Sequence, residues 1–457
     1  FTITDHFFET GEKLIYTPTS TFTGIAGTAM QMSNGSPLPT EVFAVRETKD
    51  TFKLATSKAN ATATTPTTIT FTGQSGGNLH KLEMFKKLEK SVILVDGLIQ
   101  SPLSYTPTTT TLQSNGGTVG TAKTIFNVAG ISSIVPNSIL KINDEIFWIR
   151  MPLPFALDHI NLWLIKNHDG YAFIDSGFNN IETKENWNSI FNKITNFNRL
   201  IITHYHPDHI GNASWLAEKF GLTSEISQTE YLTAHAQYQE SSGFGKDSIY
   251  NFFKSHGLIG DGLEHFANTK SKYKNSVEAP PSKFNRIIEG VNLKINDKDW
   301  KLISGYGHSP EHISLYNKDL SVLVSGDMLL PKISTNVSVW PNDPSGNPLE
   351  LFLKSITKFN ELPDDTLVLP SHGFPFKGIK NRVEQLKNHH QERLDDVMNY
   401  DKSSFRAYDL LKVLFHRELD NHQLFFAMGE AIAHINFLWH AGKIQREIKD
   451  GNYYFSK

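Results

Sequence analysis

The stretch Ile201–Asn212, IITHYHPDHIGN, places four potential metal ligands within six residues. They follow a run of β-forming residues that ends at Thr203, and they are His204, His206, Asp208 and His209. Imidazole and carboxylate groups suit a borderline divalent metal such as Zn²⁺. One tetrahedral ion with further ligands from elsewhere in the chain would not need all four, so the stretch predicts two adjacent ions. The alternative is a solvated polar loop that happens to contain three histidines.

This spacing is the HxHxDH motif, and from about residue 146 onward the chain resembles the metallo-β-lactamase superfamily. Four further residues match that family in the same order: Asp175 in AFIDSG, His308 in SGYGHSPEH, Asp327 in LVSGDML and His372 in VLPSHGFP. Each follows a β-like run or a glycine turn, as a site at the ends of strands requires. The resemblance implies an α/β fold of four layers, in the order αββα.

The resemblance also implies how the metal ions are held. The ligands would be His204, His206 and His308 for metal 1, Asp208, His209 and His372 for metal 2, and Asp327 as a bridge between the two ions. Asp175 would support the ligand loop from behind. We expect Zn²⁺ as the metal, although the same set of side chains would accept Fe or Mn.

The expected chemistry is hydrolysis. Two cations lower the pKa of a water molecule that they share, so a metal-bridging hydroxide is available near neutral pH to attack a carbonyl carbon or phosphorus. A metal ion would stabilise the oxyanion that develops. Asp208 is the candidate catalytic residue, because its carboxylate could steer the proton of the nucleophile.

The residue composition limits which branches of the family the chain can resemble. The chain has no cysteine, which excludes the thiolate ligand that zinc β-lactamases place on the second ion. A bridging aspartate is instead typical of the glyoxalase II, lactonase and metallo-RNase branches. Lys and Arg number 44 and Asp and Glu number 47, for a net charge of −3, so there is no strong nucleic-acid signal. No stretch approaches the roughly 18 apolar residues of a membrane span.

These observations predict a hydrolase of a small-molecule ester, thioester or lactone. One alternative is a phosphodiesterase or RNase of the same fold, which would need a basic channel near the metals. Another is a virion structural or attachment protein that carries an accessory hydrolase domain.

Two segments are candidates for contacts with the substrate. The loop PFALDHIN, residues 154–161, precedes an early strand, and we predict His159 and Asn161 as substrate-binding residues. The alternative for His159 is a loop histidine in water. The helical, aromatic segment Ser224–Asn268 is predicted to form a cap over the site, with a plain structural subdomain as the alternative. We expect His312 to be either a residue that supports the ligands or a satisfied loop histidine, because no ligand position is left for it.

The first part of the chain differs in character. Residues 1–143 hold 27 threonines and the remaining residues only 10, which predicts a separate β-rich region. It contains two Thr-rich tracts, Thr56–Gly77 and Tyr105–Gly120. The tracts around Tyr16–Gly27, Asp50–Gly77 and Val95–Ile146, with phrases such as DTFKLAT and GLIQSPLSYTP, resemble modules of tailed-phage virion structural proteins, which implies attachment or assembly. The junction with the hydrolase has no linker, so a natural fusion and a composite both remain open. Since residue 1 is Phe rather than Met, we expect the chain to be processed, trimmed or a fragment.

The remaining sequence divides into a catalytic domain, residues 144–379, and a C-terminal module, residues 380–457. The module shows helical patterns and then a hairpin at Ile444–Phe455, an order that resembles a winged-helix module appended to some of these hydrolases. It carries 12 Lys and Arg against 11 Asp and Glu, far from the basic excess of a duplex reader. We therefore expect the apolar stretch Leu424–Trp439 to pack on the hydrolase core or on a second subunit.

Overall fold

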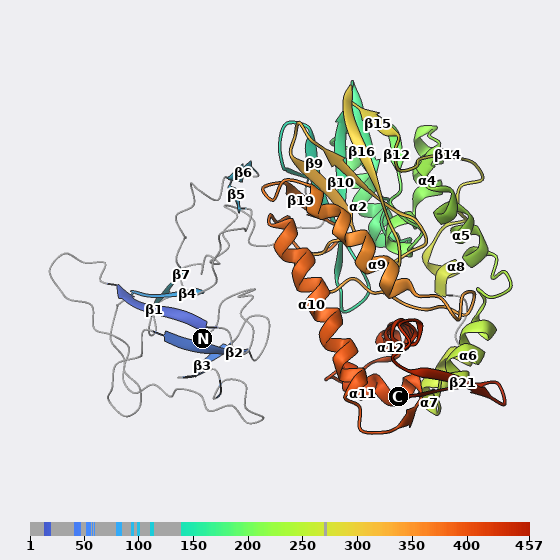
Figure 1. Cartoon of the computed structure of the whole chain (residues 1–457). Coiled ribbons are helices and arrows are strands. Elements are labelled where there is room, and N and C mark those ends of the chain that lie inside the picture. The colour runs from blue at the N-terminus through green and yellow to red at the C-terminus, as the bar shows by residue number, and fades with distance from the viewer. Residues whose placement is uncertain are drawn as a thin grey trace. The chain divides into compact units, whose positions relative to one another are not determined.

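The computed structural model describes residues 139–268 and 272–457 together with short segments of the N-terminal part: residues 13–19, 41–46, 52–55, 57, 59, 79–84, 93–95, 98–100 and 110–113. The chain divides into two units, Phe1–Ile134 and Val135–Lys457 (Figure 1). The predicted boundaries at 143/144 and 379/380 stay predictions. No helix in the described residues is long and apolar enough to cross a membrane.

In the first unit the described segments are almost all strands, in agreement with a β-rich region. Antiparallel pairing gives the orders β3-β2-β1-β4-β7 and β5-β6. The strands are β1 (Lys13–Thr19), β2 (Glu41–Arg46), β3 (Phe52–Ala55), β4 (Leu79–Met84), β5 (Ile93–Val95), β6 (Leu98–Gln100) and β7 (Thr110–Gln113). The two Thr-rich tracts lie almost wholly outside the described residues, and the resemblance to virion modules remains a prediction.

The second unit contains two sheets that carry the site. The first has the order β14-β13-β12-β11-β10-β9-β8, antiparallel from β8 to β11 and parallel from β11 to β14. Its strands are β8 (Ile139–Lys141), β9 (Ile146–Pro152), β10 (His159–Asn167), β11 (Gly170–Ile174), β12 (Phe197–Ile201), β13 (Ser224–Ile226) and β14 (Phe284–Arg286).

The second sheet has the order β15-β16-β17-β18-β19, in which only β18 and β19 are parallel. Its strands are β15 (Asn292–Ile295), β16 (Lys298–Gly305), β17 (His312–Asn317), β18 (Val322–Gly326) and β19 (Leu367–Pro370). Every residue of β17, β18 and β19 is buried. Strands covered on both faces carry continuous apolar runs rather than an alternating pattern, which is what VLVSG and LVLP show.

Helices cover the outer faces of the two sheets. On the first sheet, α2 (Ile181–Phe191) and α4 (Ala213–Phe220) bury Trp187 and Leu216 against strand residues such as Phe173. On the second, α9 (Pro348–Thr357) and α10 (Ile379–Met398) bury Phe352 and Val383. The result is the predicted four-layer αββα arrangement.

The remaining helices lie in the segment between β12 and β14 and in the second half of the chain. They are α3 (Pro207–Ile210), α5 (Gln228–Tyr238), α6 (Lys246–Ser255), α7 (Asp261–Asn268), α8 (Lys272–Ser276), η2 (Lys358–Glu361), η3 (Ala407–Leu410), α11 (Leu411–Leu414) and α12 (Asn421–His440). A small sheet, β20-β22-β21, closes the chain with β20 (Ser404–Phe405), β21 (Gln445–Lys449) and β22 (Asn452–Ser456).

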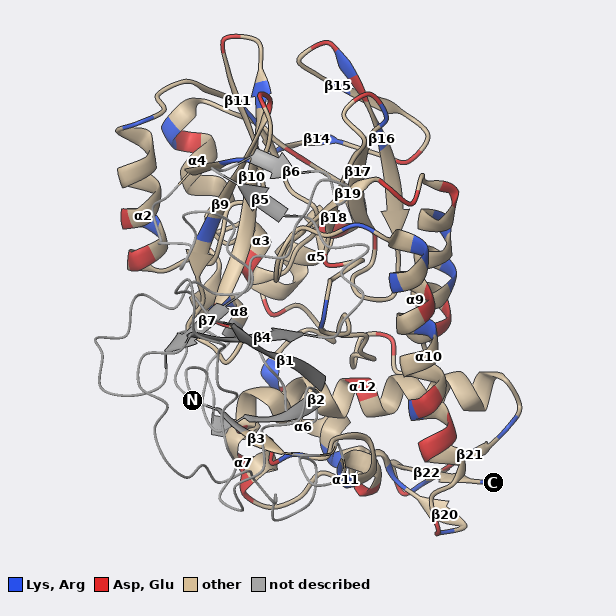
Figure 2. Cartoon of the chain, turned by 90° about the vertical axis from the view of Figure 1, so that its left-hand side faces the viewer, with Lys and Arg blue, Asp and Glu red and all other residues tan. Residues whose placement is uncertain are grey.

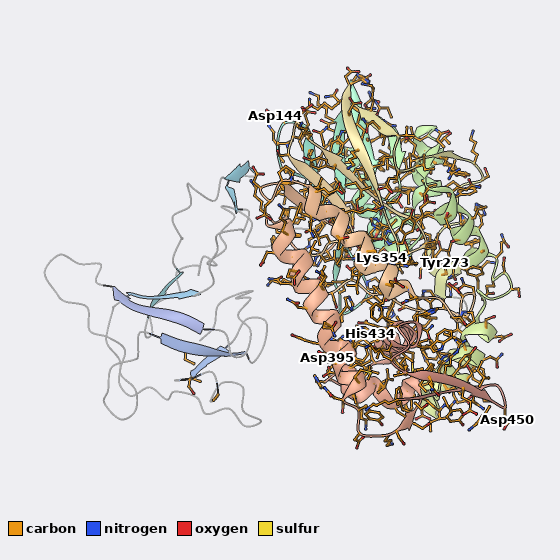
Figure 3. All side chains as sticks on the ribbon, viewed as in Figure 1. Asp144, Tyr273, Lys354, Asp395, His434 and Asp450 are labelled. Atoms are coloured by element: carbon orange, nitrogen blue, oxygen red, sulfur yellow. The ribbon has the colours of Figure 1, made fainter. Side chains whose placement is uncertain are left out.

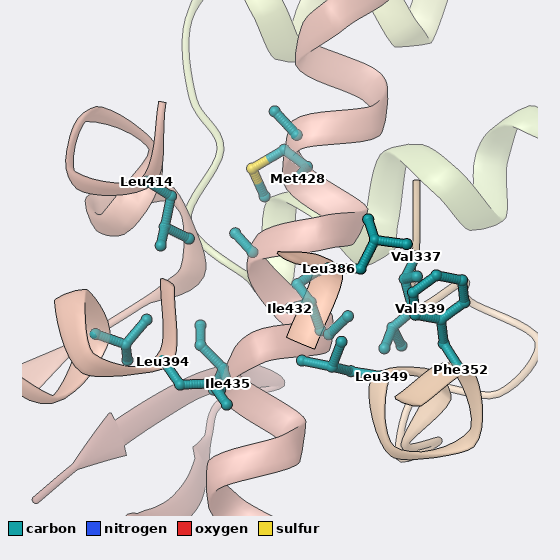
Figure 4. Close-up of a cluster of buried hydrophobic side chains, with 14 of the residues drawn as sticks. Val337, Val339, Leu349, Phe352, Leu386, Leu394, Leu414, Met428, Ile432 and Ile435 are labelled. Atoms are coloured by element: carbon teal, nitrogen blue, oxygen red, sulfur yellow. The ribbon is translucent and has the colours of Figure 1, made fainter. Parts of the chain in front are cut away.

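Helix α12 is the centre of the C-terminal part. Asp420 caps it and forms a capping box with Gln423, which satisfies N–H groups of the first turn. Its side chains Met428 and Ile432 share one apolar core with Leu349 and Phe352 of α9 (Figure 4). The apolar helix therefore packs on the hydrolase core of the same chain, as predicted for one of the two alternatives. On the exposed sides of α9 and α10, acidic and basic residues are interspersed (Figure 2).

Candidate metal centre

The HxHxDH segment begins at His204, three residues after β12 ends at Ile201, and passes directly into the short helix α3. His204 and His209 are fully buried, whereas His206 and Asp208 are half-buried. This burial pattern is incompatible with the alternative of a solvated polar loop. The segment points its donor groups into the molecule.

The second sheet delivers the other donors from the ends of three strands. His308 follows β16, Asp327 comes directly after β18, and His372 follows β19. The donor atoms form two compact groups, each with all members within 4.8 Å of one another. One group is His204, His206, His308 and Asp327, and the other is Asp208, His209 and His372. The structure thus brings together all seven residues that the sequence singled out as ligands.

Asp327 lies between the two groups. Its Oδ2 is 3.3 Å from His308 Nε2, while its Oδ1 is 3.6 Å from both His209 Nε2 and His372 Nε2. His372 Nε2 is in turn 3.4 Å from Asp208 Oδ2. Each oxygen of Asp327 therefore faces a different group, which is the arrangement that a bridging ligand needs.

Two of the donor atoms form no hydrogen bond within the described part of the protein. His209 Nε2 and Asp327 Oδ1 are buried and have no hydrogen-bond partner. Leaving a buried polar atom unpaired is costly, so such atoms call for an explanation. A pair of divalent cations fits this donor set of imidazoles and carboxylates in both number and chemical type.

His206 and Asp208 already carry the charges that metal binding requires, whereas His372 carries a proton that it must lose. Burial, together with the charge of His308, lowers the pKa of His206 to about 3, so its imidazole is neutral. Burial raises the pKa of Asp208, but His209 and His372 outweigh it and bring that pKa to about 2. Burial opposes the charge on His372 too, yet Asp327 and Asp208 raise its pKa to about 10. A bound cation would displace that proton.

Asp175 supports the ligand loop from behind. Its Oδ1 accepts a hydrogen bond of 2.7 Å from the N–H of Thr203, and its Oδ2 lies 2.8 Å from His209 Nδ1. Asp175 itself is held at a φ of 66° in the turn after β11. This geometry orients His209 so that its Nε2 faces the other donor atoms.

Asp175→Ala is expected to weaken metal binding by about 10–100-fold, because it removes the partner that orients His209. The measurement is competition for Zn²⁺ with a chromophoric chelator. Asp365→Ala, which changes an exposed aspartate, is the control. Equal zinc affinity in Asp175→Ala and wild type would show that the loop holds His209 without this carboxylate.

His159 and Asn161 lie beneath the His372 loop. The carbonyl of His159 is 2.8 Å from His372 Nδ1, and its Nε2 accepts a hydrogen bond from the N–H of Gly373. Asn161 is buried and donates its amide N–H groups to the carbonyls of Pro370 and Gly373. This geometry favours a role for Asn161 in holding the His372 loop rather than in contacting the substrate, which was the prediction.

His312 supports the bridging residue. Its Nε2 accepts a hydrogen bond of 3.2 Å from the N–H of Asp327, and its ring is fully buried. The backbone passes so close that a Cβ on Gly326 would lie 2.2 Å from His312 Nε2. Gly326 is therefore required both for its φ of 54° and for this approach.

The predicted aromatic cap is corrected by the structure. Phe253 packs edge-on against Phe425 of α12, and the ring of His256 stacks on Tyr453 at 4.2 Å. Phe252 and Phe253 belong to the same apolar core as α12. These residues of the Ser224–Asn268 segment are structural, because their apolar surface is covered by the C-terminal part.

Two residues near the centre were missed by the sequence analysis. The carbonyl of Asn336 lies 2.8 Å from His308 Nδ1, and Glu230 of α5 bonds to the segments around His204 and His308. The contact of Asn336 could not be predicted from its residue type, because every residue has a backbone carbonyl. The only signal for Glu230 was a carboxylate in a helix that is otherwise weakly charged.

Comparisons with known proteins agree with this geometry. Residues 156–372 match the family described as "Metallo-beta-lactamase superfamily", and residues 394–457 match "Metallo-beta-lactamase-like, C-terminal domain". The solved structure of a beta-lactamase domain protein from Burkholderia ambifaria is 37% identical, covers 72% of this chain and 96% of its own, and has a TM-score of 0.66.

Curated relatives are similar over the same part of the chain. The probable metallo-hydrolase YqjP of Bacillus subtilis (strain 168) is 23% identical over 303 residues, which are 65% of this chain and 92% of the relative. Hydroxyacylglutathione hydrolase GloC of Haemophilus influenzae is 25% identical over 182 residues, which are 39% of this chain and 69% of that protein. This chain is a metallo-hydrolase that belongs to the metallo-beta-lactamase superfamily.

Proposed function

We propose that this protein uses two divalent metal ions to hydrolyse a small ester, thioester or lactone. One observation carries the proposal: the two oxygens of Asp327 face two separate groups of ligands, at 3.3 Å from His308 and 3.6 Å from His209 and His372. A site for a single ion would have no need of donors on both sides of one carboxylate.

We assign metal 1 to His204, His206 and His308, metal 2 to Asp208, His209 and His372, and the bridging position to Asp327. When bound, the two ions would lower the pKa of a water molecule and polarise the bond to be cleaved. Zn²⁺ suits these donors, and Fe or Mn would be accepted by the same set.

The protein's own side chains prepare the reaction. Asp208 is the residue to which we assign the handling of the proton, because its carboxylate is ionised and its side chain keeps 20% of its surface exposed. Supporting contacts to His209, His308 and His372 hold the imidazole rings in place before substrate arrives. Such preorganisation lowers the barrier because no reorganisation is needed during the reaction.

The substrate class rests on charge and on relatives. A net charge of −3 offers little attraction to a polyanion, which favours a small substrate over RNA. GloC is named for the hydrolysis of a hydroxyacylglutathione, and this favours a thioester among the three classes.

For residues 380–457 we propose a winged-helix-like module, supported by the order of α12 and the β21-β22 hairpin.

The test is metal content by elemental analysis together with turnover of a small thioester, a lactone, bis-p-nitrophenyl phosphate and nitrocefin. Wild type is expected to hold about two ions per chain and to cleave the thioester or lactone. Asp208→Ala is expected to lose both the turnover and part of the metal, whereas Asp365→Ala on the surface keeps both. Cleavage of the phosphodiester alone would move the protein to the phosphodiesterase branch. A metal-free, inactive wild type would overturn the proposal.

A further inference from the structure

Glu230 is a fully buried carboxylate on α5 that no ligand assignment uses. Its Oε2 accepts a hydrogen bond of 2.9 Å from the N–H of Tyr205. Its Oε1 accepts two more, of 2.7 Å from Ser309 Oγ and 2.6 Å from the N–H of Glu311. Two backbone groups and one hydroxyl thus converge on a single side chain.

The two segments that meet at Glu230 both carry ligands of the first metal group. Tyr205 lies between His204 and His206, and Ser309 follows His308, which is 104 residues further along the chain than His204. One backbone hydrogen bond, from the N–H of Ile313 to the carbonyl of Thr203, also joins these segments. Glu230 therefore adds three hydrogen bonds that tie these two ligand-bearing segments to one side chain.

The other backbone group of Tyr205 is fixed from the same region of the chain. The hydroxyl of Tyr273 in α8, labelled in Figure 3, donates a hydrogen bond of 2.7 Å to the Tyr205 carbonyl. Glu230 and Tyr273 both come from the segment between β12 and β14. This segment consequently holds the ligand loop at the peptide groups on both sides of Tyr205.

Keeping a carboxylate in this place is costly. Burial raises the pKa of Glu230 to about 7, against the opposing effect of its three hydrogen bonds. A buried charged group that lacks such bonds would destabilise the fold. An apolar side chain would avoid that cost but would leave the N–H groups of Tyr205 and Glu311 without this acceptor. The carboxylate is suited to this position because it can accept several hydrogen bonds at once from two separate segments.

We propose that Glu230 is a positioning residue that sets the spacing of His204 and His206 relative to His308, and with it the affinity for the ion these three bind. The inference rests on the proposed dinuclear function. Asn161 holds the His372 loop in a comparable way, through its bonds to Pro370 and Gly373. The two groups of ligands would then each have their own support.

The test measures both zinc-binding steps of the full-length protein by competition with a chromophoric chelator. Glu230→Ala is expected to weaken one step by about 10–100-fold and Asn161→Ala to weaken the other. In the Co²⁺-loaded protein, Glu230→Ala is expected to change the visible absorption spectrum, because the ligand geometry changes. His308→Ala identifies which step belongs to the first group.

Glu311→Gln is the matched control, because Glu311 lies beside the same helix and, within the described part of the chain, its side chain bonds to Thr229 and to no ligand-bearing segment. It is expected to leave both steps unchanged. Glu230→Gln keeps the size of the side chain but turns an NH₂ group toward one of the backbone N–H donors, so its expected loss lies between wild type and Glu230→Ala.

The outcomes separate the two proposals. If wild type binds no zinc, the dinuclear function fails whatever Glu230 does. If wild type binds two ions and a Glu230→Ala protein with native circular dichroism binds both with unchanged affinity and an unchanged Co²⁺ spectrum, the positioning role is wrong.

Discussion

Replacing Asp327 with alanine is expected to lower kcat/KM by at least roughly 10²–10³-fold, the range seen when one preorganised electrostatic group is removed from an active site. The reason is that the two oxygens of Asp327 face different groups of ligands: Oδ2 is 3.3 Å from His308 Nε2, and Oδ1 is 3.6 Å from His209 Nε2. The variant is also expected to hold fewer metal ions than wild type in elemental analysis.

Asp319→Ala is the matched control for this change, since Asp319 is an exposed aspartate in the turn between β17 and β18. It is expected to keep full activity and full metal content. Asp327→Asn is a sharper variant, because it keeps the shape and presents an N–H₂ group to one of the two ions. Wild-type turnover with two ions bound in Asp327→Asn would contradict the bridging assignment.

Acidification is expected to destabilise the protein through a pair of buried histidines, His390 on α10 and His434 on α12. His434 is labelled in Figure 3. His390 Nδ1 lies 3.2 Å from His434 Nε2, and His434 Nδ1 lies 2.8 Å from the carbonyl of Glu430. Burial lowers the pKa of His434 from its ordinary 6.5 to about 4, and burial with the charge of His434 lowers that of His390 to about 2. Both rings are therefore neutral in the folded protein.

The sign of the effect follows from these values. Below about pH 6.5 the unfolded chain binds protons on both histidines, whereas the folded protein takes up none until the pH nears 4. The free energy of unfolding is expected to fall between these pH values, by about 3 kcal/mol for each histidine. The measurement is the urea midpoint at pH 6.5 and pH 4.5.

The double variant His390→Leu/His434→Leu isolates this pair, because replacing both partners of a hydrogen bond by apolar groups of similar size is nearly neutral. It is expected to lose less stability than wild type between the two pH values. Replacing the exposed His416 by leucine is the control. Equal pH dependence in wild type and the double variant would show that other buried groups cause the acid sensitivity.

Much of the catalytic part could be predicted from the sequence because its signals are local. The HxHxDH segment concentrates ligands within six residues. Apolar β-like runs such as VLVSG precede Asp327, and similar runs or a glycine turn precede His308 and His372. A strand buried on both faces is mostly apolar along its length, and a polar residue that follows it lies where the strand leaves the sheet. Strand runs and the first four ligand positions could therefore be predicted from residue types, and the family resemblance supplied His308, Asp327 and His372.

Other features depended on contacts between distant segments. Asn161 lies 209 residues before Pro370, whose carbonyl it binds, and Glu230 lies 79 residues before Ser309. Phe252 and Phe253 were predicted to belong to an aromatic cap over the site, but they lie in the apolar core that includes α12.

Residue type limits which groups a side chain can bind, and so the sequence by itself determined the fold class and the hydrolase family and predicted the ligand set. Only the tertiary structure decided which buried polar groups support the ligands and which aromatic residues face a neighbouring helix. The physical reason is that a hydrogen bond or an apolar contact between segments far apart in the chain depends on their distance in space, and that distance is set by the packing of the whole domain.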